Sequence, residues 1–157
     1  MVSTFLDQHL YSQFFQSHDR KNDADHQFRG IDVIARHELI EGDLLIDEKA
    51  ATSWTHRDLS TFAFELSWLS GEEERQGWFL DLDSRNSTTH WLIIWPRTRG
   101  HEFNQVEDIS SAEAILLDVS EVREWIKRMA EKAPQPLEEV VRLLRRSDTD
   151  RIVWSSL

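Results

Sequence analysis

Two stretches of the sequence decide the fold prediction: Gly30-Ile31-Asp32-Val33-Ile34 and Asp43-Leu44-Leu45-Ile46-Asp47-Glu48-Lys49-Ala50. Both are short apolar runs of the length of a β-strand, and the turn residues Glu41-Gly42-Asp43 stand at the start of the second. We therefore expect the two runs to form a β-hairpin.

The second strand of this hairpin carries charged residues on both of its faces. Asp47 and Lys49 share one face and Glu48 points the opposite way, because successive side chains of a strand alternate. Asp32 on the neighbouring strand brings another carboxylate to the face of Asp47. Two carboxylates from adjacent strands suit a hard divalent cation such as Mg²⁺. A lysine beside such an ion orients the attacking water, so this set of residues fits phosphodiester hydrolysis.

These residues resemble the PD-(D/E)XK nuclease superfamily, whose signature is an acidic residue at the start of one strand and (Asp/Glu)-x-Lys on the next. Asp32, Asp47 and Lys49 match it, with fourteen residues between the two aspartates, and Ile31 stands where the family often has proline. The resemblance implies an α/β protein of the restriction-endonuclease-like fold. Its α-β-β-β-α-β core, a central mixed sheet flanked by helices, would cover roughly residues 4–130.

The same resemblance implies a metal-dependent nuclease that uses Mg²⁺ or Mn²⁺ and acts on nucleic acid, DNA in the first instance. The wider run from Gln27 to Trp78 also looks like uncharacterised bacterial and phage proteins of this type. In the family the middle residue of the motif ligates the metal through its backbone carbonyl, which gives Glu48 that role here.

Four more residues are candidates for the same site. Glu65 is the one charged residue on the polar face of an expected aromatic strand, so it is either a further catalytic carboxylate or an exposed glutamate. Gln27 is a candidate for contact with the substrate, with a loop hydrogen bond as the alternative. Arg97 and Arg99 are candidates for binding a phosphate backbone.

The motif also has an ordinary explanation. An acidic residue followed by (Asp/Glu)-x-Lys arises by chance in an acidic chain, and the sequence holds a second copy, Asp19-Arg20-Lys21, which we place in a polar loop over Ser17–His26. Asp32 and Asp47 would then be exposed residues paired with Lys49, an arrangement that contributes little to stability. The apolar strand around Asp47 favours the metal site.

The remaining elements follow from hydrophobic periodicity and from turn residues. Asp7 lies on the first expected helix and is a further acid that could approach the site. One expected helix covers residues 4–17, a second is capped by Ser120, and a third opens at Pro136. The further expected strands are 60–68, 77–80, 90–95 closed by Pro96, 114–117 and 152–154.

The composition indicates one folded domain over residues 1–157. The chain is 39% hydrophobic and contains no cysteine, which excludes disulfides, thiolate zinc sites and cysteine nucleophiles. No apolar run approaches the roughly 20 residues that cross a bilayer, and the N-terminus lacks the blocks of a signal peptide. We expect a cytoplasmic protein without membrane contact.

The net charge opposes a simple nucleic-acid role. Eighteen Lys and Arg against 29 Asp and Glu give −11, so the molecule repels a polyanion at long range. The main alternative is therefore a non-catalytic acidic binding module on the same fold: an immunity protein, an antitoxin-like protein or a DNA mimic. A homodimer, or a larger complex whose partner supplies the DNA-binding surface, is a third possibility.

Overall fold

The computed structural model describes residues 1–53, 55–56, 62, 64, 67–70, 73–77, 79, 87–100 and 103–132. The chain divides into two compact units, residues 1–60 with 83–119 and residues 61–82 with 120–157. The first unit holds the five-stranded sheet, and the second holds a short hairpin and most of the helix α4. The single domain over residues 1–157 stays a prediction.

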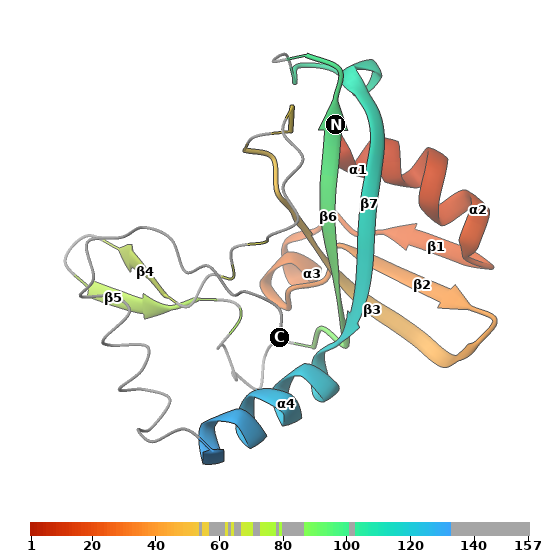
Figure 1. Cartoon of the computed structure of the whole chain (residues 1–157). Coiled ribbons are helices and arrows are strands. Elements are labelled where there is room, and N and C mark those ends of the chain that lie inside the picture. Colours follow the sequence, from red (N-terminus) through yellow and green to blue (C-terminus); the bar gives the residue numbers. More distant parts are fainter. Residues whose placement is uncertain are drawn as a thin grey trace. The chain divides into compact units, whose positions relative to one another are not determined.

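The first unit is built on a mixed sheet with the strand order β1-β2-β3-β6-β7 (Figure 1). Its strands are β1 (Ser17–Arg20), β2 (Val33–His37), β3 (Ile40–Ala50), β6 (His90–Thr98) and β7 (Ile109–Asp118). Neighbouring strands are antiparallel except for β3 and β6, which are parallel. The α/β class and the mixed sheet are confirmed.

The helical segments are short except for the last. They are α1 (Val2–Leu6), the π-helical segment η1 (Asp7–Tyr11), α2 (Ser12–Phe14), α3 (Ala24–Phe28), the 3₁₀ segment η2 (Val106–Asp108) and α4 (Val119–Lys132). The first three follow one another without a break over residues 2–14, close to the helix expected over 4–17. The start of α4 lies one residue before the expected Ser120.

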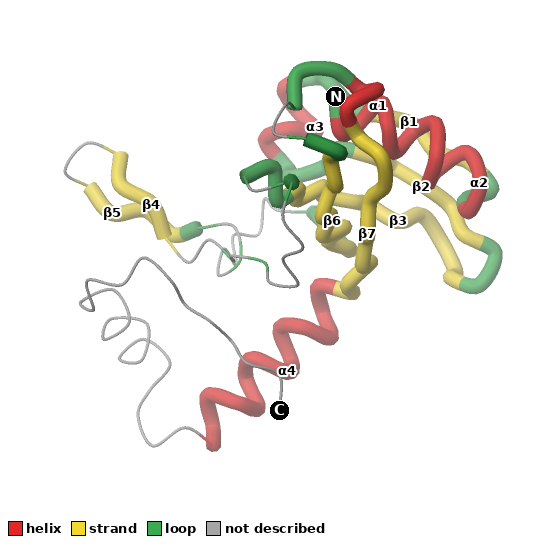
Figure 2. The backbone as a smooth tube through the Cα atoms, turned by 45° about the horizontal axis from the view of Figure 1, so that its top comes forward, coloured by secondary structure: helices red, strands yellow, loops and turns green. Residues whose placement is uncertain are grey.

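The N-terminal helical segment packs on one face of the sheet, which we call the helix face (Figure 2). Apolar side chains that alternate along the strands are buried there, and this burial is the main stabilising term for the unit. The buried core consists of Leu6, Tyr11, Val33, Ala35, Leu44, Ile46, Leu92 and Ile94. Because strand side chains alternate, Glu48 also belongs to the helix face, and Asp47 and Lys49 belong to the opposite face.

The expected hairpin is present, but its turn is not where the sequence places it. The turn lies at Glu38-Leu39, where the Leu39 N–H donates to Nδ1 of His37 at 3.2 Å. Gly42 lies inside β3 with a φ of 89°, a value that glycine adopts readily. The β2–β3 register shifts opposite this segment, between Ala35 and His37. The glycine therefore serves a bulge rather than the turn.

The polar loop expected over Ser17–His26 is wrong, because this stretch forms β1 and most of α3. β1 is an edge strand that pairs antiparallel with β2, from Ser17 opposite Arg36 to Arg20 opposite Val33. α3 is capped by Asp23, whose side chain accepts a hydrogen bond from the His26 N–H at 3.1 Å. Backbone pairing and capping thus order a stretch that has no apolar periodicity.

β6 continues through Pro96, where the sequence predicts its end. Proline removes one ladder donor, which matters only where a neighbouring strand would accept it. The pairing of β3 with β6 ends at Ala50 and Ile94, whereas β7 still pairs with β6 at Pro96 and beyond. Pro96 therefore lies beyond the end of the β3 pairing, where β7 is the strand that still pairs with β6. The expected strand 114–117 is part of the longer β7.

The second unit contains the antiparallel pair β4 (Ser67–Ser70) and β5 (Glu73–Gln76). Ring contacts join Phe64 to Phe62 and to Phe79, with centroids 5.6 and 4.4 Å apart. Most of the strands expected at 60–68 and 77–80, and all of the elements expected at Pro136 and at 152–154, lie outside the described residues.

Candidate active site

Asp47 and Lys49 lie together on the face of β3 that is opposite the helix face. The Lys49 Nζ is 2.7 Å from the Asp47 Oδ1. Asp47 is only 5% exposed, and the Lys49 side chain is 26% exposed. The alternation of the strand thus brings these two residues together as predicted, with the acid buried and the lysine reaching solvent.

Asp32 directly precedes β2 and is held in place by hydrogen bonds to its backbone and its carboxylate. Its N–H donates to the Ile46 carbonyl at 2.9 Å, and its carbonyl accepts from the Lys21 N–H at 2.8 Å. The carboxylate accepts from the Glu48 N–H at 2.8 Å through Oδ2 and from the Gln27 Nε2 at 3.3 Å through Oδ1. These contacts fix the Asp32 carboxylate beside β3.

The two aspartates interact with each other. Burial raises the pKa of Asp47 to about 7; the charge and hydrogen bond of Lys49 oppose this rise, and the Asp32 carboxyl adds to it through its charge and a side-chain hydrogen bond. Neighbouring carboxyls resist joint ionisation, and together with burial this favours a proton on Asp47 up to near neutral pH. A divalent cation in the place of that proton would remove the repulsion.

The donors at this place fit Mg²⁺ or Mn²⁺. Within the described ranges, no group of three or more His, Asp or Glu side chains is arranged to hold a metal ion. Two carboxylates are nevertheless enough for Mg²⁺, which completes its six ligands with water and phosphate oxygens. The same pair does not suit structural zinc, which prefers four nitrogen or sulfur ligands.

Glu48 points to the helix face, as predicted, and its carboxylate is the centre of an ion-pair network. The Arg20 Nη1 lies 2.9 Å from the Glu48 Oε2, and the Tyr11 hydroxyl donates to the Glu48 Oε1 at 2.9 Å. Arg20 also binds Asp7, with Nη2 2.7 Å from Oδ1. Burial works to lower the Arg20 pKa, but the hydrogen bonds that Arg20 donates to Asp7 and Glu48 raise it above its ordinary value. The Glu48 side chain is therefore not available to a metal on the other face.

A pocket of about 310 Å³ opens where β1 ends and β2 begins. The lining residues come from the first turn of α1, from strands of the sheet and from the segment around Asp32. It is lined by Val2, Ser3, Arg20, Lys21, Asn22, Gln27, Asp32, Glu48, Ala50 and Ile94. Asp32 therefore lines the pocket and also interacts with Asp47. Gln27, a candidate for substrate contact, lines this pocket.

Sequence reasoning missed Lys21. The copy Asp19-Arg20-Lys21 is not in a loop: Asp19 and Arg20 belong to β1, and Lys21 follows them directly. Lys21 forms an ion pair with Asp19 and lies next to Asp32 through its backbone hydrogen bond. Burial alternates along β1, with His18 and Arg20 half-buried and their neighbours exposed, but no hydrophobic pattern in the sequence marks this alternation.

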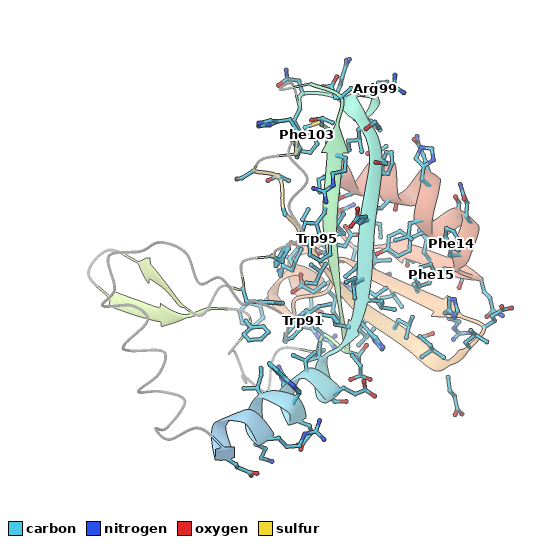
Figure 3. All side chains as sticks on the ribbon, in the orientation of Figure 1. Phe14, Phe15, Trp91, Trp95, Arg99 and Phe103 are labelled. Carbon is cyan, nitrogen blue, oxygen red and sulfur yellow. The ribbon has the colours of Figure 1, made fainter. Side chains whose placement is uncertain are left out.

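The two arginine candidates lie away from the aspartates. Trp91 of β6 pairs with Asp47, and Arg97 is six residues further along the same strand, or about 20 Å at ~3.3 Å per residue. Arg97 shares the face of Asp47 and lies 3.7 Å from Glu113 of β7. Figure 3 shows Arg99 at the opposite end of β6 from Trp91. The structure does not bring either arginine to the Asp32–Asp47 pair.

Two further acids do not join the pair either. Asp7 lies on the helix face, where Arg20 binds it and where His18 Nε2 is 3.8 Å from its Oδ1. The structure therefore does not bring Asp7, a further candidate acid, to the Asp32–Asp47 pair. Glu65 lies outside the described residues.

Comparison with known proteins finds no matching family model, no matching curated protein and no matching solved structure. Among the helices that the structure describes, none is long and apolar enough to span a membrane. The geometry of the site and the charge of the chain are thus the basis for inferring a function.

Proposed function

We propose that this chain is a metal-dependent nuclease of the PD-(D/E)XK type that hydrolyses phosphodiester bonds in nucleic acid, with DNA as the first candidate substrate. The grouping of Asp32, Asp47 and Lys49 carries the proposal. A buried carboxyl is 2.7 Å from a partly exposed ammonium and interacts with a second carboxyl. Such a group is stable when a proton or a cation lies between the acids, and it is typical of a catalytic site rather than of a surface ion pair.

The position of these residues in the sheet supports the same proposal. Asp32 precedes β2, and Asp47 and Lys49 lie in the adjacent β3, as the family pattern of an acid followed by (Asp/Glu)-x-Lys requires. A helical segment, three antiparallel strands and a parallel fourth strand are compatible with an α-β-β-β-α-β core, with the short α3 inserted. The second helix of that core would come from residues 51–89, which the structure describes only in part.

Each residue has a distinct role in the proposed reaction. Asp32 and Asp47 would hold Mg²⁺ or Mn²⁺ with the main-chain carbonyl of Glu48, and the bound ion would polarise the phosphoryl oxygen and stabilise the leaving group. Lys49 orients the attacking water and offsets charge on the phosphate. The water oxygen bonds to phosphorus and the bond to the bridging sugar oxygen breaks. That oxygen takes up a proton, which leaves a phosphate monoester and a free hydroxyl.

The test combines a metal titration with a cleavage assay on single- and double-stranded DNA and RNA. We expect Mn²⁺ to raise the melting temperature of the wild type and to support cleavage. Asp47→Asn should fold, lose the Mn²⁺ effect and cut about a thousandfold more slowly, because several kcal/mol of charge stabilisation disappear. Asp25→Asn is the matched control, since Asp25 is 77% exposed on α3. Cleavage by a well-folded Asp47→Asn protein at the wild-type rate contradicts the proposal.

The charge of −11 favours a second candidate, a non-catalytic acidic module that binds a basic protein. The two candidates differ in their dependence on metal. A nuclease needs the ion at Asp32 and Asp47, whereas an acidic module binds its partner equally well in a chelator. The second candidate replaces the first if no nucleic acid is cut in Mg²⁺ or Mn²⁺ and Asp47→Asn leaves binding to the basic partner unchanged.

A further inference from the structure

The pocket beside Asp32 has the size and lining of a site for one small ligand. Its volume of about 310 Å³ lies at the lower end of the range for small-molecule sites. Val2, Ala50 and Ile94 give it an apolar part, and Ser3, Asn22 and Gln27 supply polar groups. A ligand with an apolar ring system and a polar tail suits such a lining.

The charges that line the pocket are unequal in their availability. Arg20 is shared by two carboxylates, Glu48 at 2.9 Å and Asp7 at 2.7 Å, so this group attracts no anion. Lys21 is paired with Asp19, whose side chain is 69% exposed, and an ion pair open to water on one side is weak. The Lys21 ammonium can therefore exchange Asp19 for a phosphate at little cost.

The position of Lys21 relative to Asp32 is fixed by the backbone. The Lys21 N–H donates to the Asp32 carbonyl at 2.8 Å, and the Gln27 Nε2 lies 3.3 Å from both the Lys21 carbonyl and the Asp32 Oδ1. The pocket adjoins the proposed metal site through Asp32, because its strand residues Glu48, Ala50 and Ile94 belong to the helix face, whereas Asp47 and Lys49 lie on the opposite face of the sheet.

We propose that this pocket receives one nucleotide of the substrate, adjacent to the cleaved phosphodiester, with Lys21 binding its phosphate. The apolar part at Val2, Ala50 and Ile94 packs against the base or sugar. The inference rests on the proposed function, because the scissile phosphate is what brings the substrate to Asp32.

Calorimetric titration in Mg²⁺ with deoxyadenosine 5′-monophosphate and with inorganic phosphate tests the inference without any cleavage. We expect the wild type to bind the nucleotide more tightly than phosphate. Lys21→Gln should weaken nucleotide binding about tenfold or more, the usual loss for a charged hydrogen bond. Ala50→Leu should weaken binding of the nucleotide but not of phosphate, because it fills the pocket. Lys127→Gln, on α4, removes the same charge elsewhere and should change nothing.

The salt dependence of binding to a short single-stranded oligonucleotide gives a second readout. One lost phosphate contact should reduce the slope of log K against log salt by about 0.7 in Lys21→Gln and leave it unchanged in Lys127→Gln. If Ala50→Leu does not fold, Ala50→Val takes its place. The Lys21 side chain is 21% exposed and its ammonium pairs with the exposed Asp19, so its variant should fold.

Equal affinity of the wild type for phosphate and nucleotide overturns the nucleotide assignment, and so does unchanged binding in both pocket variants. The outcome is separable from the proposed function. A wild type that binds the nucleotide through Lys21 but cuts no nucleic acid refutes the nuclease and supports the pocket. A wild type that cuts nucleic acid, with pocket variants that bind and cut equally well, refutes the pocket alone.

Discussion

Loss of Arg20 should destabilise the protein far more than loss of an ordinary surface arginine. Arg20 is 19% exposed in its side chain and neutralises Glu48, which is 9% exposed, and it also binds Asp7. In Arg20→Gln the Glu48 carboxylate stays buried with the Tyr11 hydroxyl and the weaker contact from Ser3 as its remaining side-chain partners in the described network. Breaking a buried pair by removing one partner costs about 3–5 kcal/mol.

The size of the effect can be checked by urea unfolding and by thermal melting. For a chain of this length 1 kcal/mol corresponds to about 2–4 °C, so we expect the melting temperature of Arg20→Gln to fall by at least about 6–12 °C. The double variant Arg20→Gln with Glu48→Gln should recover much of this loss, because no uncompensated charge remains. Arg36→Gln is the matched control, since Arg36 is 63% exposed and pairs with Asp43 at the surface.

A loss below about 1 kcal/mol in Arg20→Gln would refute the reasoning, because it would mean that water replaces the arginine without cost. A double variant that is no more stable than Arg20→Gln would also refute it, since the penalty would then not come from the charge on Glu48. Arg36→Gln should stay within about 0.5 kcal/mol of the wild type.

Three further predictions concern the aspartate pair and its lysine. The pKa of Asp47 is raised to about 7, so between about pH 4 and pH 7 the folded state holds a proton that the unfolded chain has lost. The free energy of unfolding should therefore fall as the pH rises through this window, by at most about 4 kcal/mol. Unfolding curves measured across the window should show this fall, and Asp47→Asn should remove it. Asp32→Asn keeps an oxygen that accepts from the Glu48 N–H but removes a negative charge, so at pH 8 without metal its melting temperature should exceed that of the wild type. The variant should also lose the rise in melting temperature that Mn²⁺ gives the wild type. An equal rise in both proteins would mean that the ion binds elsewhere. Lys49→Ala and Lys49→Arg should bind nucleic acid like the wild type in Mg²⁺ but fail in single-turnover cleavage. The reason is that the compact ammonium acts on charge that develops only in the transition state. Cleavage at the wild-type rate in either variant would show that Lys49 takes no part in the chemistry.

The parts of the site that depend on local alternation could be predicted from the sequence. The hairpin and the shared face of Asp47 and Lys49 follow from a period of two in an apolar strand, and both are present. The position of Glu48 on the opposite face from Asp47 and Lys49 follows from the same period. The glycine at position 42 was assigned to the turn because a bulge and a turn use the same residue type, and sequence alone does not distinguish them.

The parts that depend on tertiary pairing could not be predicted. β1 carries Ser17, His18, Asp19 and Arg20, none of which is aliphatic, so no hydrophobic pattern marks it as a strand. Its half-buried His18 and Arg20 are held by the ring of Tyr11 and by Asp7, which come from the N-terminal helical segment. The neutralisation of Glu48 by Arg20 needs both that strand and the N-terminal helix in place. The position of Lys21 beside Asp32 has the same origin, because it follows from the β1–β2 pairing.

Glu48 is held through both its backbone amide and its carboxylate, and this restricts which substitutions the chain can accept. The (Asp/Glu)-x-Lys pattern leaves its middle position open, yet here the Glu48 amide holds Asp32 on one side and the Glu48 carboxylate holds Arg20 and Tyr11 on the other. Any residue except proline supplies that amide, so it is the buried carboxylate that should make position 48 tolerate exchange poorly, although this side chain takes no part in the proposed chemistry. Among diverged copies of the chain, positions 20 and 48 should therefore change as a pair, because the loss of either charge leaves the other buried and unpaired.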